Sequence, residues 1–172
     1  MSIWPFRRSQ TAEDALRLLD AVTLASRNFA FFGEGRVPDT LEGRFALMTI
    51  HGALALIRLK QDPQNAGLAQ AFTDVLFRQF DAGLREAGVG DTSVPKRMHK
   101  MAGEFYGRLE AYEQALGDDE ALAAALVRNV VGLAPGPFVE QLSGHVRRLA
   151  AQQAAAPALA MLEPDSWAPA TS

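Results

Sequence analysis

The sequence contains no cysteine among its 172 residues. This absence excludes disulfide bonds, thiolate metal sites and cysteine nucleophiles, and it fits a protein of a reducing compartment. An excess of one charge is missing as well, since 17 lysines and arginines face 20 aspartates and glutamates for a net charge of −3. A charge this small does not draw the whole protein onto nucleic acid or an anionic membrane, so any such contact must come from a local patch.

Long apolar segments are also missing. The most apolar run, residues 45–57, has 13 residues and would extend about 20 Å as a helix, which is short of the roughly 30 Å hydrocarbon layer of a bilayer. His51 interrupts this run, and the first residues of the chain lack the apolar core of a signal peptide. The sequence therefore predicts a soluble protein without a membrane span.

Catalytic and metal-binding signatures are absent too. The segments "GEGRVP" and "GVGDTS" begin like dinucleotide-binding loops, but both lack the third glycine and neither follows a predicted strand. The three histidines, His51, His99 and His145, are predicted on three different helices without metal-ligand spacing. We therefore expect no catalytic residues, no metal and no cofactor, and a binding protein rather than an enzyme.

The apolar periodicity is helical almost throughout, and no segment alternates like a strand. Helices are predicted over about 11–32, 39–60, 66–87, 93–116, a fifth from about 118, and 138–152. Short connections between long helices favour an all-α compact bundle of about six helices, formed by a single domain of residues 11–152. Residues 1–10 are expected to be flexible, and the alanine- and proline-rich residues 153–172 are expected to form a mobile tail.

The predicted second helix, residues 39–60, is apolar on most of its circumference, which places it at the centre of the bundle. Its N-terminus carries Asp39 as a candidate cap, Glu42 as the capping-box partner, and Gly43, which lets a neighbour approach closely. A polar stripe remains on one side of this helix, because Arg44, His51 and Arg58 follow one another at intervals of seven residues. Two interpretations stay open: structural ion pairs with Glu104 or Asp81, or the floor of a groove that contacts a partner.

The predicted fourth helix has an apolar line and a basic face. The apolar line recurs every three or four residues and comprises Val94, Met98, Met101, Phe105, Leu109, Tyr112 and Leu116. The basic face comprises Lys96, Arg97, Lys100 and Arg108. It is either a solvated surface or a partner-binding patch. Tyr106 lies beside the apolar line, where its ring can stack at the rim of a binding surface.

Two separated blocks carry a family resemblance. "VPDTLEGRFALMTIH" (37–51), followed by "RLK" (58–60), and "GVGDTSVPKRMHKMAGEFYGRLEAY" (88–112) resemble the signatures of the ubiquinol–cytochrome c chaperone family. "ALAAALVRNV" resembles the family's next segment, so that the similarity covers about residues 19–131. The family pattern carries bulkier residues where this chain has Gly52 and Ala53.

The resemblance implies a helical, non-enzymatic assembly factor of respiratory complex III that binds cytochrome b as it is made and inserted. It implies a bacterial short form at the cytoplasmic side of the inner membrane. Further contacts would reach the ribosome exit region or a small partner protein, and the inner-membrane surface, but not DNA. The implied partner-binding residues are Lys96, Arg97, Lys100, Tyr106, Arg108, Arg44, His51 and Arg58, while Asp39, Glu42 and Gly43 belong to the structural signature.

Three hypotheses follow. An assembly chaperone needs an exposed apolar surface rimmed by polar groups. An RNA- or ribosome-associated module needs the basic face of residues 96–108 to form one patch, with binding that weakens steeply with salt. An enzyme needs Arg44, His51 and an acid to converge in one pocket.

Overall fold

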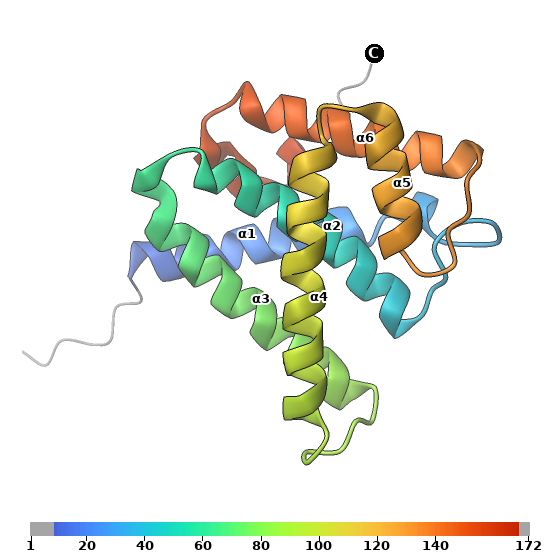
Figure 1. The fold of residues 1–172 in the computed structure, drawn as a ribbon. Coiled ribbons are helices and arrows are strands. Elements are labelled where there is room, and N and C mark those ends of the chain that lie inside the picture. The colour runs from blue at the N-terminus through green and yellow to red at the C-terminus, as the bar shows by residue number, and fades with distance from the viewer. Residues whose placement is uncertain (1–8, 169–172) are drawn as a thin grey trace, which may run out of the picture.

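The computed structural model describes residues 9–168, which form six α-helices and four short 3₁₀ turns (Figure 1). The helices are α1 (Gln10–Ser26), α2 (Leu41–Lys60), α3 (Ala66–Glu86), α4 (Val94–Ala115), α5 (Asp119–Asn129) and α6 (Pro137–Ala154). The prediction of an all-α bundle of about six helices is confirmed. Residues 1–8, most of the segment expected to be flexible, lie outside the described residues.

Helix α2 occupies the middle of the bundle, as its apolar circumference predicts. Of its 20 residues, 14 are buried, and the helix packs against α1, α3, α4 and α6. Gly52 allows the close packing expected of it, because a Cβ added there would lie 3.2 Å from Leu76 Cδ2 on α3. The central helix thus carries much of the core.

The N-terminus of α2 differs from the prediction. Thr40, not Asp39, caps the helix, because the Thr40 hydroxyl accepts a hydrogen bond of 3.1 Å from the Gly43 N–H. The Asp39 carboxylate instead accepts a 2.8 Å hydrogen bond from Arg44 Nε, and Glu42 is exposed. The capping box is therefore replaced by a threonine cap and an adjacent ion pair.

Gly43 has a structural role at this turn. A Cβ at this position would lie 1.9 Å from the carbonyl oxygen of Pro38, far inside van der Waals contact. Only glycine allows the chain to enter α2 in this way.

Helix α1 ends earlier than predicted, at Ser26 rather than near Phe32. Residues Phe29–Phe31 form a separate 3₁₀ turn, η1, which begins where the Asn28 side chain accepts a 3.0 Å hydrogen bond from Ala30 N–H. This local cap competes with continuation of the helix and ends it. The three phenylalanines of "NFAFF" therefore lie beyond the end of α1, in this 3₁₀ turn and in the residue that follows it.

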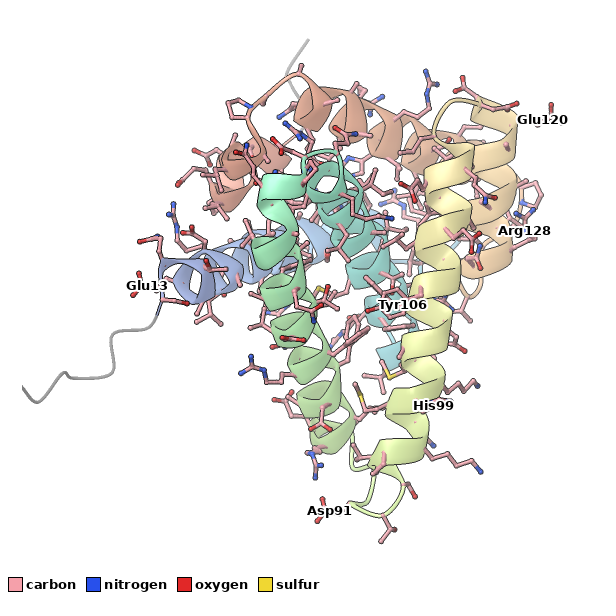
Figure 2. The ribbon with its side chains drawn as sticks, turned by 60° about the vertical axis from the view of Figure 1, so that its left-hand side comes forward. Glu13, Asp91, His99, Tyr106, Glu120 and Arg128 are labelled. Atoms are coloured by element: carbon pink, nitrogen blue, oxygen red, sulfur yellow. The ribbon has the colours of Figure 1, made fainter. Side chains whose placement is uncertain are left out.

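Helices α3 and α4 form a hairpin whose connecting end projects from the body (Figures 1 and 2). Arg85 fastens the connection by ion pairs to Asp81 and Asp91, the first with a distance of 2.8 Å. Along α4 the predicted apolar line is confirmed, with Phe105 and Tyr112 fully buried and Met98 and Met101 partly buried against the core. The projecting half of α4 is more solvated than the half that crosses α2.

The C-terminal segment is not a mobile tail as far as the structure describes it. Turns η3 (Ala158–Leu162) and η4 (Pro164–Trp167) pack on α1 and α6, and Met161, Leu162 and Trp167 are only 2, 6 and 3% exposed. The Trp167 indole N–H donates to the Met161 carbonyl over 2.9 Å. Prediction from composition was wrong here because three large apolar side chains outweigh the surrounding alanines and prolines.

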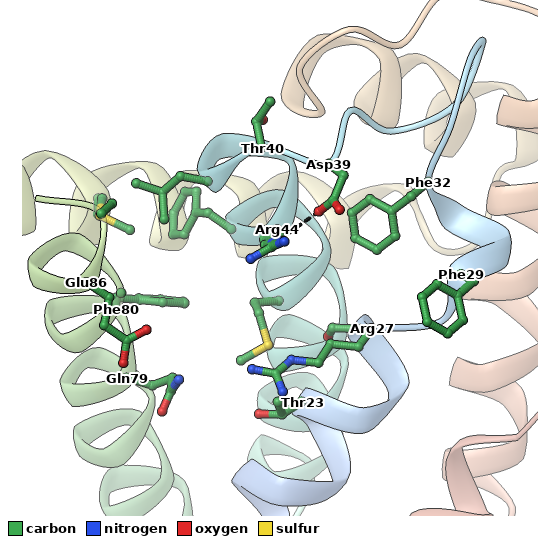
Figure 3. Close-up of a pocket in the computed structure, with 17 residues that line it drawn as sticks. Thr23, Arg27, Phe29, Phe32, Asp39, Thr40, Arg44, Gln79, Phe80 and Glu86 are labelled. Atoms are coloured by element: carbon green, nitrogen blue, oxygen red, sulfur yellow. Dashed lines mark hydrogen bonds and ion pairs between the residues drawn. The ribbon is translucent and has the colours of Figure 1, made fainter.

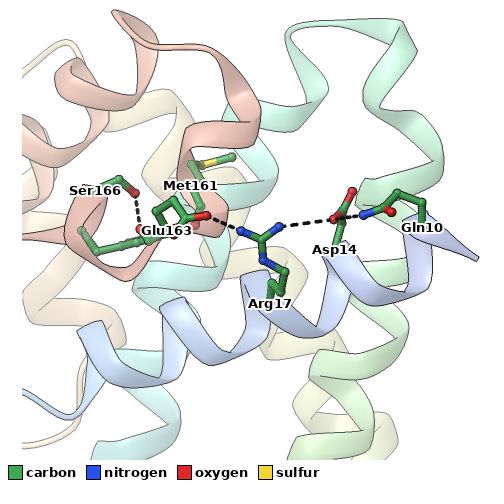
Figure 4. Close-up of polar contacts among 7 residues, drawn as sticks. Gln10, Asp14, Arg17, Met161, Glu163 and Ser166 are labelled. Atoms are coloured by element: carbon green, nitrogen blue, oxygen red, sulfur yellow. Dashed lines mark hydrogen bonds and ion pairs between the residues drawn. The ribbon is translucent and has the colours of Figure 1, made fainter. Parts of the chain in front are cut away.

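Polar contacts hold the same segment in place. Arg17 of α1 forms an ion pair with Glu163, and the Ser166 hydroxyl donates to the Glu163 carbonyl (Figure 4). On the other side, Arg58 of α2 donates 2.8 Å hydrogen bonds to the carbonyls of Gln153 and Ala156. The helical domain therefore extends beyond the predicted boundary at residue 152, at least to Trp167.

Within residues 9–168, no helix is both long enough and apolar enough to cross a bilayer.

Candidate functional site

A groove lies between α1, α2 and α3, with a contribution from α4 (Figure 3). It encloses about 860 Å³, a volume in the range of sites that take up a small molecule or several large side chains. The lining residues of α1 and the following turn are Thr23, Ser26, Arg27, Phe29 and Phe32. Those of α2 and its cap are Asp39, Thr40, Leu41, Arg44, Phe45 and Met48, and those of α3 and α4 are Gln79, Phe80, Gly83, Glu86, Ala87 and Met101.

The floor of the groove combines rigid rings with flexible thioethers. Phe45 and Phe80 pack edge to face with centroids 5.0 Å apart, and both rings are nearly buried. Met48 of α2 and Met101 of α4 are partly buried beside them. Methionine side chains adapt to differently shaped apolar partners, so this floor suits an apolar ligand of variable surface.

The mouth of the groove exposes an unusual aromatic side chain. Phe29 is 92% exposed although the backbone that carries it is held in place. Asn28 caps the turn, and Arg36 donates a 3.1 Å hydrogen bond to the Ala30 carbonyl. Together with the apolar lining of the adjoining groove, this ring forms a contiguous apolar surface, and such a surface bordered by polar residues is typical of an interaction site.

Charged side chains border the apolar floor. Arg44 and Asp39 form an exposed ion pair with a 2.8 Å Nε–Oδ1 distance. The hydrogen bond and the charge of Arg44 lower the pKa of Asp39, and the same contact raises the pKa of Arg44. Arg27 on the α1 wall and Glu86 on the α3 wall have no ion-pair partner within the described residues. The groove thus has an apolar floor and charged side chains along its edges.

His51 is not in this groove but fully buried in the core. Its Nδ1 lies 2.8 Å from the Leu47 carbonyl, and its Nε2 lies 3.2 Å from Nε2 of His145. A carbonyl only accepts, so His51 carries its proton on Nδ1, and His145 must donate from Nε2 to the bare Nε2 of His51. Phe31 and Trp167 pack around the His51 ring.

The histidine pair is a neutral structural contact. Burial lowers the pKa of His51 from 6.5 to about 4 and outweighs the hydrogen bond to Leu47, which raises it; repulsion between the protonated forms of His51 and His145 is the smallest cause and also lowers it. Burial and the charge of Arg148 also lower the pKa of His145. The enzyme hypothesis requires Arg44 and His51 to converge in one pocket. Instead, Arg44 borders the groove and His51 is buried in the core. Within residues 9–168, no three or more side chains of histidine, aspartate or glutamate lie together in a way that could hold a metal ion.

The predicted polar stripe of α2 separates into three environments. Arg44 borders the groove, His51 is buried, and Arg58 binds the carbonyls at the end of α6. The acidic partners expected for the stripe are engaged elsewhere. Asp81 pairs with Arg85, and Glu104 lies 3.8 Å from both Lys100 and Arg108.

The predicted basic face of α4 is also divided. Lys96, Arg97 and Lys100 are exposed on the projecting half of α4. The Arg108 side chain is only 18% exposed, and its guanidinium lies 5.1 Å from the centre of the Phe45 ring. Arg108 therefore covers the back of the groove floor, and the four cations do not form one exposed patch.

Tyr106 lies away from the groove, midway along α4 (Figure 2). Its half-exposed ring packs edge-on against Phe77, with centroids 5.8 Å apart. It borders a second, smaller pocket of about 410 Å³ between α2, α3 and α4. The role of Tyr106 at the rim of a binding surface stays a prediction.

Sequence reasoning pointed to Arg44 at the groove edge but did not identify the apolar residues that form its floor and mouth. Phe29, Met48 and Met101 come from three separate elements, and only the folded chain brings them to one pocket. One local signal was present, because "NFAFF" places three phenylalanines immediately before the "GEGRVP" turn. Apolar residues at a helix break are typical of either a loop packed on the core or a contact surface, and this segment contains both, since Phe31 is buried and Phe29 exposed.

Comparisons with known proteins give a consistent result. Residues 34–165 match the family model described as Ubiquinol-cytochrome C chaperone. The chain is similar to ubiquinol-cytochrome c reductase complex assembly factor 1 of Mus musculus, with 28% identity over 116 residues. It is similar to the Xenopus laevis protein of the same name, with 28% identity over 104 residues. These regions cover 66 and 59% of this chain but only 39 and 52% of the two relatives.

A solved structure is similar over nearly its full length. The crystal structure of the Cbp3 homolog from Brucella abortus has 38% sequence identity and a TM-score of 0.80, and the match covers 92% of this chain and 91% of that one.

Proposed function

Since the chain belongs to the ubiquinol-cytochrome C chaperone family, we propose that it is a non-enzymatic assembly chaperone of respiratory complex III. Its client is newly made cytochrome b, bound at the cytoplasmic side of the inner membrane before assembly is complete. The proposal extends the role named for the longer vertebrate relatives to this shorter chain.

The groove between α1, α2 and α3 is the observation that carries this proposal. An unassembled membrane protein exposes apolar helices, and a chaperone for it must offer an apolar surface without closing around it irreversibly. The methionine and phenylalanine floor, together with the exposed ring of Phe29, meets this requirement. The contact we propose is an apolar client helix lying in the groove, with Phe29 packed against its side.

Contacts beyond the groove use the other predicted residues. We assign peripheral contact with anionic lipid headgroups of the inner membrane to the exposed Lys96, Arg97 and Lys100. We propose that the same cations also contact the ribosome exit region. Tyr106 and the second pocket would bind a small partner protein. Arg44 acts at the groove edge, whereas Arg58 and His51 act in the core.

A site-specific crosslinking experiment tests the client and the groove together. A photoreactive amino acid is placed at Phe29 or Met48 in cells that synthesise epitope-tagged cytochrome b, and adducts are identified through the tag. We expect adducts from both groove positions. Val131 and Leu159, which are 48 and 54% exposed outside the groove, provide matched control positions and should give none. Equal adducts from all four positions, or none containing cytochrome b, would contradict the proposal.

The physiological role is tested by the b-type haem spectrum of membranes from a strain without this gene. We expect selective loss of the complex III b-haem signal, restored by the intact gene, with the other cytochromes unchanged. An unaltered spectrum would show that complex III assembly does not depend on this protein.

A further inference from the structure

The two walls of the groove carry opposite charges. Arg27 follows the last turn of α1 and is exposed on one wall. Glu86 is the last residue of α3 and is exposed on the other wall. Figure 3 shows Glu86 on the α3 side of the groove, whereas Arg27 extends from the end of α1 across the face of α2. Between them the Arg44–Asp39 pair neutralises itself, so that the remaining charge of the groove is positive along α1 and negative along α3.

The position of Glu86 is not explained by the stability of its own helix. The C-terminal end of a helix is the negative end of its dipole, which disfavours an acidic side chain there. The neighbouring Arg85 is fully engaged by Asp81 and Asp91, and within the described residues no cation lies within ion-pair distance of Glu86. A basic group on a bound partner would compensate this charge.

We propose that the groove holds its apolar client helix in one direction only. The occupant is an apolar helix with an acidic residue on the flank that faces Arg27 and a basic residue on the flank that faces Glu86. This inference rests on the proposed function and adds the orientation of the client and the charge pattern that the groove selects.

The direction follows from elementary geometry. The apolar floor is indifferent to the direction of a helix, because burial of apolar area has no polarity. Turning the helix end for end, with its apolar side still on the floor, exchanges its left and right flanks. The acidic flank then faces Glu86 and the basic flank faces Arg27, so two attractions become two repulsions. Charge arrangement of this kind sets register and orientation more than total affinity.

The experiment uses synthetic helical peptides with a leucine strip, glutamates along one flank and lysines along the other. A second peptide has the two flanks exchanged, and a third has glutamines on both. Each peptide carries one cysteine at its N-terminus. Because the natural chain has no cysteine, a single Ala87→Cys or Gln79→Cys substitution reports which end of the groove the peptide terminus occupies. These two exposed positions on the α3 wall are eight residues apart, or about 12 Å along a helix.

We expect the first peptide to form its disulfide preferentially at one of the two positions and the flank-exchanged peptide at the other. The preference should be roughly three- to tenfold, because exposed ion pairs are weak, and should shrink in high salt. The glutamine peptide should react at both positions. The Arg27→Glu/Glu86→Arg double variant should reverse both preferences.

The matched control is the Arg128→Glu/Glu120→Arg variant. It makes the same two charge changes at exposed positions of α5 (Figure 2) and should leave both preferences intact. Equal reaction of each charged peptide at both positions would overturn the proposed orientation while leaving the groove as a binding site. Absence of reaction by every peptide would instead contradict the proposed function of the groove.

Discussion

At the scale of single residues, a substitution at Phe29 should weaken binding of the client without changing the stability of the fold. Its ring is 92% exposed and contributes little apolar burial to the folded chain. Phe29→Ala should therefore change the free energy of unfolding by no more than about 0.5 kcal/mol, yet weaken capture of an apolar client helix. Urea denaturation and the yield of crosslink from Met48 measure the two effects. Leu159→Ala removes a comparable exposed side chain outside the groove and should change neither.

His51 should make stability dependent on pH. The unfolded chain binds a proton near pH 6.5, whereas burial keeps folded His51 neutral down to about pH 4. Between these values the unfolded state binds more protons, so stability falls as pH falls, by about 3 kcal/mol in all. Above about pH 7 neither state is protonated at this residue, and its contribution is constant.

Denaturation of the wild type and of His51→Phe at pH 7.5, 6 and 5 isolates this contribution. The wild type should lose more stability on acidification than the variant, and His99→Gln, which removes an exposed histidine, should follow the wild type. Parallel pH profiles for wild type and His51→Phe would show that the buried imidazole is not the cause.

At the scale of elements, the C-terminal turns behave as part of the core. Trp167 is 3% exposed, and its N–H is satisfied by Met161. Trp167→Ala should destabilise the protein by about 3–5 kcal/mol, because a large buried ring is replaced by a cavity. Thermal unfolding measures the loss, with Leu159→Ala as the exposed control in the same segment. A change below about 1 kcal/mol would mean that the turns detach readily in solution.

Sequence patterns predicted the elements better than their ends and neighbours. The apolar circumference of α2 and the core line of α4 are properties of contiguous residues, so periodicity revealed both. The contact between His51 and His145 joins residues 94 positions apart, and no local pattern encodes it. The docked segment after Ala154 was missed because alanine and proline dominate its composition, although three large apolar side chains decide where it lies.

The division of the basic face has a physical cause at the same scale. Arg97 and Arg108 are eleven residues apart, about three helical turns, so they lie on the same side of α4. The first belongs to the half of α4 that projects into solvent, and the second to the half where Phe45 of α2 covers that side. Helical spacing gives the direction of a side chain, but only the packing of neighbours determines whether that direction is solvent.

At the scale of the whole molecule, the membrane contact that we propose lies on the projecting α3–α4 hairpin, apart from the groove. If Lys96, Arg97 and Lys100 meet anionic lipid, changing all three to glutamine should weaken binding to phosphatidylglycerol vesicles by roughly one to two orders of magnitude at low salt. Vesicle flotation measures this binding, and phosphatidylcholine vesicles should bind neither protein. An Arg78→Gln/Arg128→Gln/Arg148→Gln variant changes net charge equally at other exposed positions. Equal weakening by both triple variants would contradict a local contact.

The ion pair between Arg17 and Glu163 joins residues 146 positions apart, and beside it the last turns pack against the first helix. Because a chain is synthesised from its N-terminus, α1 emerges well before the turns that pack on it, and its burial against Met161, Leu162 and Trp167 must wait until those turns have been made. Contacts between residues this far apart in sequence form slowly, so the closure of this part of the core should be a late step of folding.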